Sequence, residues 1–117
     1  MRLVVPGPPS YRLELVSVLT EVFLRVYKDA EHTLVAACDS DLIGETFREG
    51  KLKLEVRADF YRGARTTVVD ALAAIDTADI ANLVGEAIVQ AAVRRSLVDP
   101  SAVLHIDGVP HVQMVRI

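Results

Sequence analysis

Tryptophan is absent from this chain and cysteine occurs once, as Cys38. A single cysteine excludes an intramolecular disulfide and is typical of a reducing compartment. Although 51% of the residues are hydrophobic, no run approaches the roughly twenty apolar residues that a membrane-spanning helix requires. The N-terminus lacks the charged region, apolar run and cleavage site of a signal peptide. We therefore expect a soluble, cytoplasmic protein without membrane association.

The chain also lacks the motifs of common enzyme classes. The segment Gly44 to Lys51 ends in Gly-Lys, but its glycines do not have phosphate-loop spacing, and no dinucleotide-binding fingerprint is present. Cys38 and the three histidines, His32, His105 and His111, show none of the tight spacings of zinc sites. No set of serine, histidine and acid is recognisable. The sequence favours binding over catalysis and predicts neither a metal nor a cofactor.

A length of 117 residues fits one domain that can bury a core without disulfides or metal. Residues 1–10 contain the run Pro6-Gly7-Pro8-Pro9, which breaks both helix and strand. We expect residues 1–20 to form an arm or an extra strand, and residues 21–117 to form the domain.

Alternating apolar residues predict the first strands. Glu21–Tyr27 and the apolar run Thr33–Cys38 flank a polar turn and predict a hairpin. A short helix is expected over Asp41–Glu49, because Ile43 and Phe47 lie one turn apart and Gly50 is a common helix end. Lys51–Arg57 then alternates strictly, which predicts a strand with Leu52, Leu54 and Val56 buried.

The C-terminal segment predicts a second hairpin. Asp107-Gly108 between apolar runs is a strong signal for a two-residue turn. This turn pairs Ile106 with Val109, His105 with Pro110, and Leu104 with His111, so the two histidines point to opposite faces. Pro110 then falls at a non-hydrogen-bonded pair, which favours a local sheet edge.

The longest helical pattern runs from Thr77 to Val98, with apolar residues at three- and four-residue intervals. Gly85 inside it indicates either close approach of another backbone or a tolerated glycine. A shorter helix is expected to start at Thr66 or Thr67 and to reach Ile75. The predicted fold is α+β: a mainly antiparallel sheet of two hairpins plus one strand, packed against one long helix and two shorter helices.

Basic residues cluster in one stretch of an otherwise acidic chain. Between Arg48 and Arg65 six basic residues face three acidic ones, a local balance of +3 in a chain of net charge −3. Together with Phe60 and Tyr61, such a stretch is a candidate nucleic-acid contact, and the alternative is a solvated face. The candidate contacts are Arg48, Lys51, Lys53, Arg57, Arg62 and Arg65.

A second set of residues could form a polar cleft, namely Cys38, Asp39, Asn82, His111 and Gln113. Cys38 ends a buried strand, where it is either an inert core residue or a thiol activated by a helix start, an activation that Asp39 opposes. Asn82 either bonds a neighbouring loop or faces a ligand. His111 and Gln113 form either a hydrogen-bonded sheet margin or a polar pair at a pocket.

Three ordered stretches carry a resemblance to a known family: ACDSDLIGETFREGKLKLEV from Ala37, ANLVGEAIV from Ala81, and LVDPSAVLHIDGVPHVQMVRI from Leu97. They resemble the archaeal domain-of-unknown-function family numbered 424. The resemblance implies a cytosolic, single-domain α+β protein with a loose association with translation genes, and no activity that could be transferred. Val112 stands where alanine is expected. The matching positions are Cys38, Asp39, Gly44, Phe47, Gly50, Asn82, Leu83, Gly85, Pro110, His111 and Gln113.

The leading hypothesis is a non-catalytic binding module associated with translation or RNA, whose partner is RNA or a translation protein. The rival hypothesis is a small enzyme or ligand-binding protein that uses the polar cleft. A third hypothesis is a homodimer, which predicts a sizeable exposed apolar patch.

Overall fold

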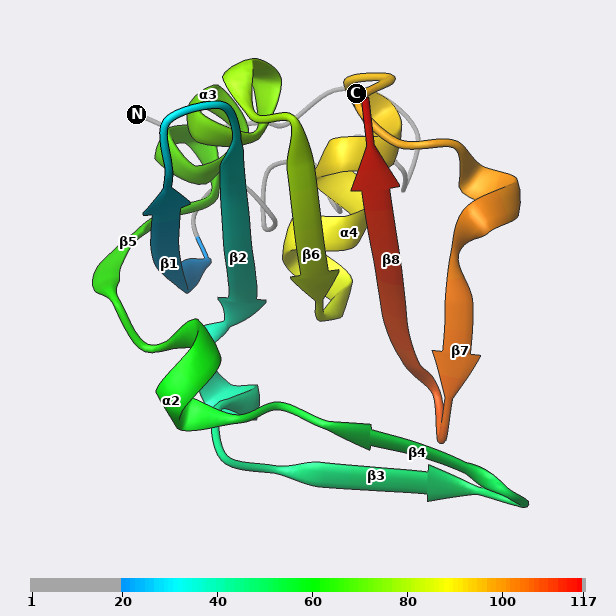
Figure 1. The fold of residues 1–117 in the computed structure, drawn as a ribbon. Helices are drawn as coiled ribbons and strands as arrows, with labels where there is room; N and C mark the ends of the chain where they lie inside the picture. The colour runs from blue at the N-terminus through cyan, green and yellow to red at the C-terminus, as the bar shows by residue number, and fades with distance from the viewer. Residues whose placement is uncertain (1–19, 117) are drawn as a thin grey trace, which may run out of the picture.

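A six-stranded sheet with the strand order β5-β1-β2-β6-β8-β7 lies at the centre of the molecule, and a two-stranded sheet, β3-β4, extends from its lower end (Figure 1). The computed structural model describes residues 20–116. The predicted arm at residues 1–20 therefore lies outside the described residues except for Thr20. The strands are β1 (Glu21–Lys28), β2 (Thr33–Asp39), β3 (Thr46–Glu49), β4 (Leu52–Glu55), β5 (Ala64–Thr67), β6 (Ile80–Val84), β7 (Leu104–Ile106) and β8 (Val109–Val115).

Helices α3 (Val68–Thr77) and α4 (Glu86–Arg94) pack on one face of the large sheet and enclose the main core. Alternate strand residues such as Val35, Leu83 and Val112 point into this core. The opposite face, which we call the open face, carries Phe23, Ala36, Cys38 and Val84, and it is covered near the carboxyl end of β2 by β4 and by α2 (Ala58–Tyr61). The remaining elements are two 3-10 turns, η1 (Ser40–Leu42) and η2 (Pro100–Ala102).

The predicted mixed α+β class is confirmed, but the single long helix from Thr77 to Val98 is wrong. Its first part is strand β6, which pairs parallel with β2 and antiparallel with β8. Its second part is α4, and Gly85 separates the two with φ of 116° and ψ of 152°. A residue with that backbone cannot continue a helix. The run Ile80–Val84 is a central strand buried between neighbours, and such a strand carries no alternation that would distinguish it from a helix.

The predicted helix over Asp41–Glu49 is also wrong. Only η1 is helical there, and Phe47 and Arg48 lie in β3, which pairs with β4. The strand expected at Lys51–Arg57 is β4, but it belongs to the separate two-stranded sheet instead of the main one. Leu54 and Val56 are buried as expected, whereas Leu52 is 52% exposed because it lies at the outer end of this hairpin.

Local signals placed two other elements correctly. Thr67 caps α3 by accepting a hydrogen bond on its side-chain oxygen from the amide of Asp70 at 3.2 Å. The β7-β8 hairpin has the predicted register, with Ile106 opposite Val109 and His105 opposite Pro110. However, β8 lies between β6 and β7 and is not an edge strand. Pro110 is tolerated because it lies one residue beyond the last β6-β8 pair, Val84 with His111.

Candidate functional site

Four of the five predicted cleft residues lie on the open face. Asn82 and Gln113 are directly opposite one another in the β6-β8 ladder. His111 is the next residue of β8 on the same side, opposite Val84, and Cys38 is opposite Val84 on the β2 side. Since antiparallel and parallel partners share a face, these side chains form two adjacent rows across the sheet.

Asp39 lies on the helix-covered side of the sheet, away from the other four. Its carboxylate accepts hydrogen bonds from the backbone amides of Ala87 at 2.9 Å and Ile88 at 3.1 Å, so it caps the N-terminus of α4 from a distant strand. Gly85 packs directly against it, because a Cβ at that position would lie 2.4 Å from the Asp39 Cγ. Of the two interpretations of Gly85, a close backbone or a tolerated glycine, neither describes the contact, because the group that lies close to Gly85 is the Asp39 side chain. Burial raises the pKa of Asp39, and the two amide bonds act in the opposite direction.

The Cys38 thiol is fully buried. Burial, together with the charge of Asp39, raises its pKa to about 12. A thiol with that pKa is protonated at neutral pH and is a poor nucleophile. Among residues 20–116 there is no group of three or more histidine, cysteine or carboxylate side chains that could hold a metal ion.

His111 is half-buried, and burial lowers the pKa of its imidazole. The neutral ring keeps one donor and one acceptor nitrogen. Beside it, the amide groups of Asn82 and Gln113 each offer donors and an acceptor, and Gln113 is exposed. These three side chains can therefore form hydrogen bonds with a neutral polar ligand.

The six predicted basic residues separate onto two surfaces. Arg48, Lys51 and Lys53 lie on the β3-β4 hairpin or its turn, where Arg48 is opposite Lys53 and Lys53 forms an ion pair with Glu55 at 2.5 Å. Arg57, Arg62 and Arg65 lie around α2 and β5 at the other end of the open face.

A cluster of arginines and aromatic rings joins the second surface to β1. The guanidinium carbons of Arg62 and Arg65 lie 5.9 Å and 5.2 Å from the centre of the Phe23 ring, and that of Arg25 lies 4.8 Å from the centre of the Tyr27 ring. Tyr27 also stacks on Phe60 with 5.4 Å between ring centres. We call this cluster the arginine-aromatic face: Phe23, Arg25, Tyr27, Phe60, Arg62 and Arg65.

Sequence reasoning missed Arg25 and Tyr27 as members of a candidate surface. The signal was present, because strict alternation in β1 places Phe23, Arg25 and Tyr27 on one side. What the linear pattern could not supply is the neighbour, since β5 joins β1 at the sheet edge from about forty residues further along the chain.

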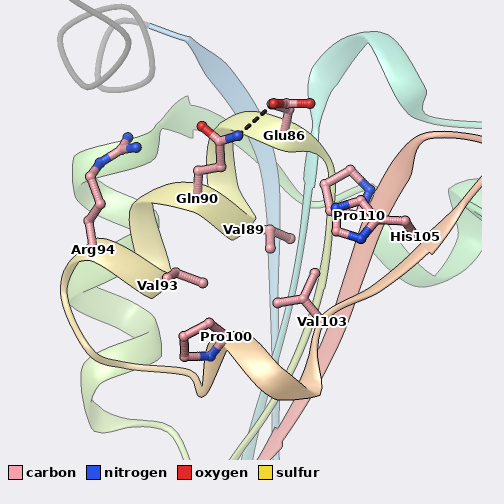
Figure 2. Close-up of a pocket in the computed structure, with 9 residues that line it drawn as sticks. All are labelled: Glu86, Val89, Gln90, Val93, Arg94, Pro100, Val103, His105 and Pro110. Carbon is pink, nitrogen blue, oxygen red and sulfur yellow. Dashed lines mark hydrogen bonds between the residues drawn. The ribbon is translucent and has the colours of Figure 1, made fainter. Parts of the chain in front are cut away.

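A groove lies on the helix-covered side of the molecule between α4, η2 and β7 (Figure 2). Its volume is about 270 Å³. Glu86 and Gln90 lie along one wall and are joined by a hydrogen bond, and Arg94 lies at the far end of the same helix. The lining residues are Glu86, Val89, Gln90, Val93, Arg94, Pro100, Val103, His105 and Pro110.

Comparison with known proteins gives a family and a fold. Residues 27–117 match the family described as "Protein of unknown function (DUF424)". The chain is similar to a solved structure, "Crystal structure of an uncharacterized conserved protein from Methanopyrus kandleri", with 25% identity and a TM-score of 0.67, over 80% of this chain and 90% of that chain. That neighbour comes from an archaeon, in agreement with the archaeal family that the motifs implied. No curated protein matches. None of the helices within residues 20–116 combines the length and apolar character needed to span a bilayer.

Proposed function

This chain belongs to the DUF424 family of proteins of unknown function, and we propose that it is a non-catalytic module that binds single-stranded RNA through the arginine-aromatic face. The observation that carries the proposal is the position of three guanidinium groups against aromatic rings at one end of an open sheet face. Proteins that hold single-stranded nucleic acid combine cationic groups that contact phosphates with aromatic rings that stack on bases.

The charge of this face supports an anionic partner. Arg25, Arg57, Arg62 and Arg65 are exposed, and the carboxylates beside them are Asp59 and Glu21. Asp59 forms an ion pair with Arg57 at 2.7 Å, and Glu21 with Arg65 at 3.3 Å. The face itself therefore carries a balance of +1, three arginines against these two carboxylates, and the adjoining Arg57 raises the balance to +2 in a chain whose net charge is −3. Phosphates are therefore attracted to this end of the molecule.

The rings supply surfaces for bases. Tyr27 and Phe60 are only half-buried, and the Tyr27 hydroxyl donates to the Phe60 backbone oxygen at 2.6 Å, which fixes the orientation of the Tyr27 ring, on which Phe60 stacks. A fixed ring loses little conformational entropy when a base stacks on it. Further along the sheet, Asn82 and Gln113 offer the donors and acceptors that can read base edges.

Fluorescence anisotropy with a labelled single-stranded RNA of about twelve nucleotides tests the proposal directly. We expect the wild-type protein to bind this RNA at low salt. In the double variant R62A/R65A the slope of log affinity against log salt concentration should become less negative by about 1.4, because two phosphate contacts are lost. The matched control is R94A/R95A, which removes two exposed arginines from the helix side and should leave the slope unchanged. If wild-type protein does not bind RNA even at low salt, the proposal fails.

The association with translation that the family resemblance implied makes ribosomal or transfer RNA the natural candidate. The same assay with structured RNA and with duplex RNA shows whether the protein binds unpaired or paired bases. We expect unpaired bases to be preferred, because stacking on Tyr27 and Phe60 requires them. A preference for duplex over single-stranded RNA would contradict the role given to the rings.

The rival proposal, a ligand-binding protein or small enzyme at the polar cleft, is supported by the juxtaposition of Asn82, Gln113 and His111. The inaccessibility of Cys38 and the engagement of Asp39 with α4 favour binding of a neutral polar ligand there over nucleophilic catalysis. N82A/Q113A separates the two proposals. If this variant binds RNA more weakly with an unchanged salt slope, Asn82 and Gln113 recognise bases. If it binds RNA with full affinity, the two amides take no part in RNA binding and are available to bind another ligand.

A further inference from the structure

The groove beside α4 takes no part in the proposed RNA face, because it lies on the helix-covered side of the sheet (Figures 1 and 2). Its floor is apolar: Val93 and Val103 are half-buried, and Pro100 is exposed. Its helical wall carries a stripe of polar residues at four-residue spacing, namely Glu86, Gln90 and Arg94. Residues four apart lie on the same side of a helix, so the stripe follows one edge of the groove.

The two ends of the stripe have opposite charge and no opposite charge beside them. Glu86 and Arg94 are both exposed, and neither forms an ion pair within residues 20–116. Glu86 is instead the acceptor of a hydrogen bond from the Gln90 side chain, which lies midway between the two charges. The acid and the base lie at equal distances on either side of the central amide. When two such helices lie antiparallel, the acid of each therefore faces the base of the other.

We propose that two copies of this chain associate through the groove, with α4 of each copy lying antiparallel against α4 of the other. In this arrangement Glu86 of one copy faces Arg94 of the second copy, and the reverse pair forms by symmetry. The two Gln90 side chains meet near the two-fold axis, and Val93 of each copy lies over the apolar floor of the other. A shared surface of this kind is the isologous contact of a two-fold dimer.

The size of the contact sets its strength. A nine-residue helix is about 13.5 Å long, so the interface is small and belongs to the weak, reversible class. The inference is independent of the proposed function, because the arginine-aromatic face lies on the other side of the sheet and remains accessible in the dimer.

Sedimentation velocity over protein concentrations from about 10 to 500 µM tests the proposal, because weak dimers dissociate in this range. We expect wild-type protein to show reversible self-association. E86R and R94E should each raise the dimer dissociation constant about tenfold or more, since each change replaces two attractions by two repulsions. E86R/R94E should restore association, because the two charges are exchanged and face each other again.

The double variant also separates the interface from an effect on the helix itself. Glu86 and Arg94 suit the dipole of α4, so reversing both charges places each at the wrong end and lowers monomer stability. Restored association in a less stable protein can only come from pairing between copies. R95E is the matched control, because Arg95 lies outside the groove and should leave the dissociation constant unchanged. A wild-type chain that is monomeric throughout, or a dimer insensitive to both single reversals, would overturn the proposal.

Discussion

Replacement of Asp39 tests the contact that joins the two halves of the fold. This carboxylate on β2 accepts the amides of Ala87 and Ile88 at the start of α4, forty-eight and forty-nine residues further along the chain. Its side chain is buried, with 7% exposure. In Asp39→Ala both amides lose their acceptor in a place where water has little access.

The structure allows the cost to be estimated. A buried donor left without a partner costs about 1–3 kcal/mol, so two amides give about 2–6 kcal/mol. Burial of the Asp39 carboxylate is itself unfavourable, as its raised pKa reflects, so its removal offsets part of this loss. We therefore expect Asp39→Ala to lower the free energy of unfolding by about 3 kcal/mol. Asp39→Asn keeps one acceptor oxygen and should lose about half as much.

Urea unfolding followed by far-UV circular dichroism measures these differences from the transition midpoints. The control is Asp41→Ala, because Asp41 is exposed on η1, where the change should stay within about 0.5 kcal/mol. An Asp39→Ala protein as stable as wild type would contradict the capping role of Asp39. So would an Asn variant less stable than the Ala variant.

Three other predictions follow from the same region and the open face. Gly85→Ala should lower the free energy of unfolding by about 3 kcal/mol or more, because φ is 116° and the new methyl group meets Asp39. In a double-mutant cycle, Gly85→Ala with Asp39→Ala should lose less stability than the two single variants added together, because the clash with the Asp39 side chain is removed. Cys38, with a pKa of about 12, should resist Ellman's reagent at pH 8 in the native state and react at once in denaturant, whereas rapid native labelling would show an accessible thiolate. The pKa of His111 is lower in the folded state than its unfolded value of about 6.5, so its contribution to stability is complete above that pH and is lost as pH falls through the folded value. Between pH 7 and pH 5 the melting temperature of His111→Gln should therefore fall less than that of wild type. An equal fall in both proteins would show that other groups cause it.

Local sequence signals located the elements whose neighbours are close in the chain. The Asp107-Gly108 turn determined the β7-β8 register, and Thr67 marked the start of α3. In both cases the deciding interaction joins residues within a few positions of one another, so the linear pattern contains it.

The longest helix prediction failed because its deciding interactions are distant. Ile80–Val84 is a strand since β2 and β8 lie on either side of it, and neither neighbour can be identified from the five apolar letters alone. Gly85 was the one local sign of a break. Its positive φ and its contact with Asp39 exist only once β2 and α4 are brought together.

The same limit applied to the site. Asn82, His111 and Gln113 were grouped by sequence and do share a face, because alternation in β8 is strict. Asp39 does not share that face, because it directly follows Cys38 in β2 and adjacent strand residues point to opposite faces. Its capping role across the sheet could not be read from its position in the chain.

A titration of isotope-labelled protein with a single-stranded RNA, followed by amide chemical shifts, locates the RNA-binding surface. We expect saturable shifts concentrated in β1, α2 and β5 and extending to Asn82 and Gln113 on the open face, with α3 and α4 unaffected. Shifts centred on the groove beside α4, or no shifts at all at low salt, would contradict RNA binding by the arginine-aromatic face.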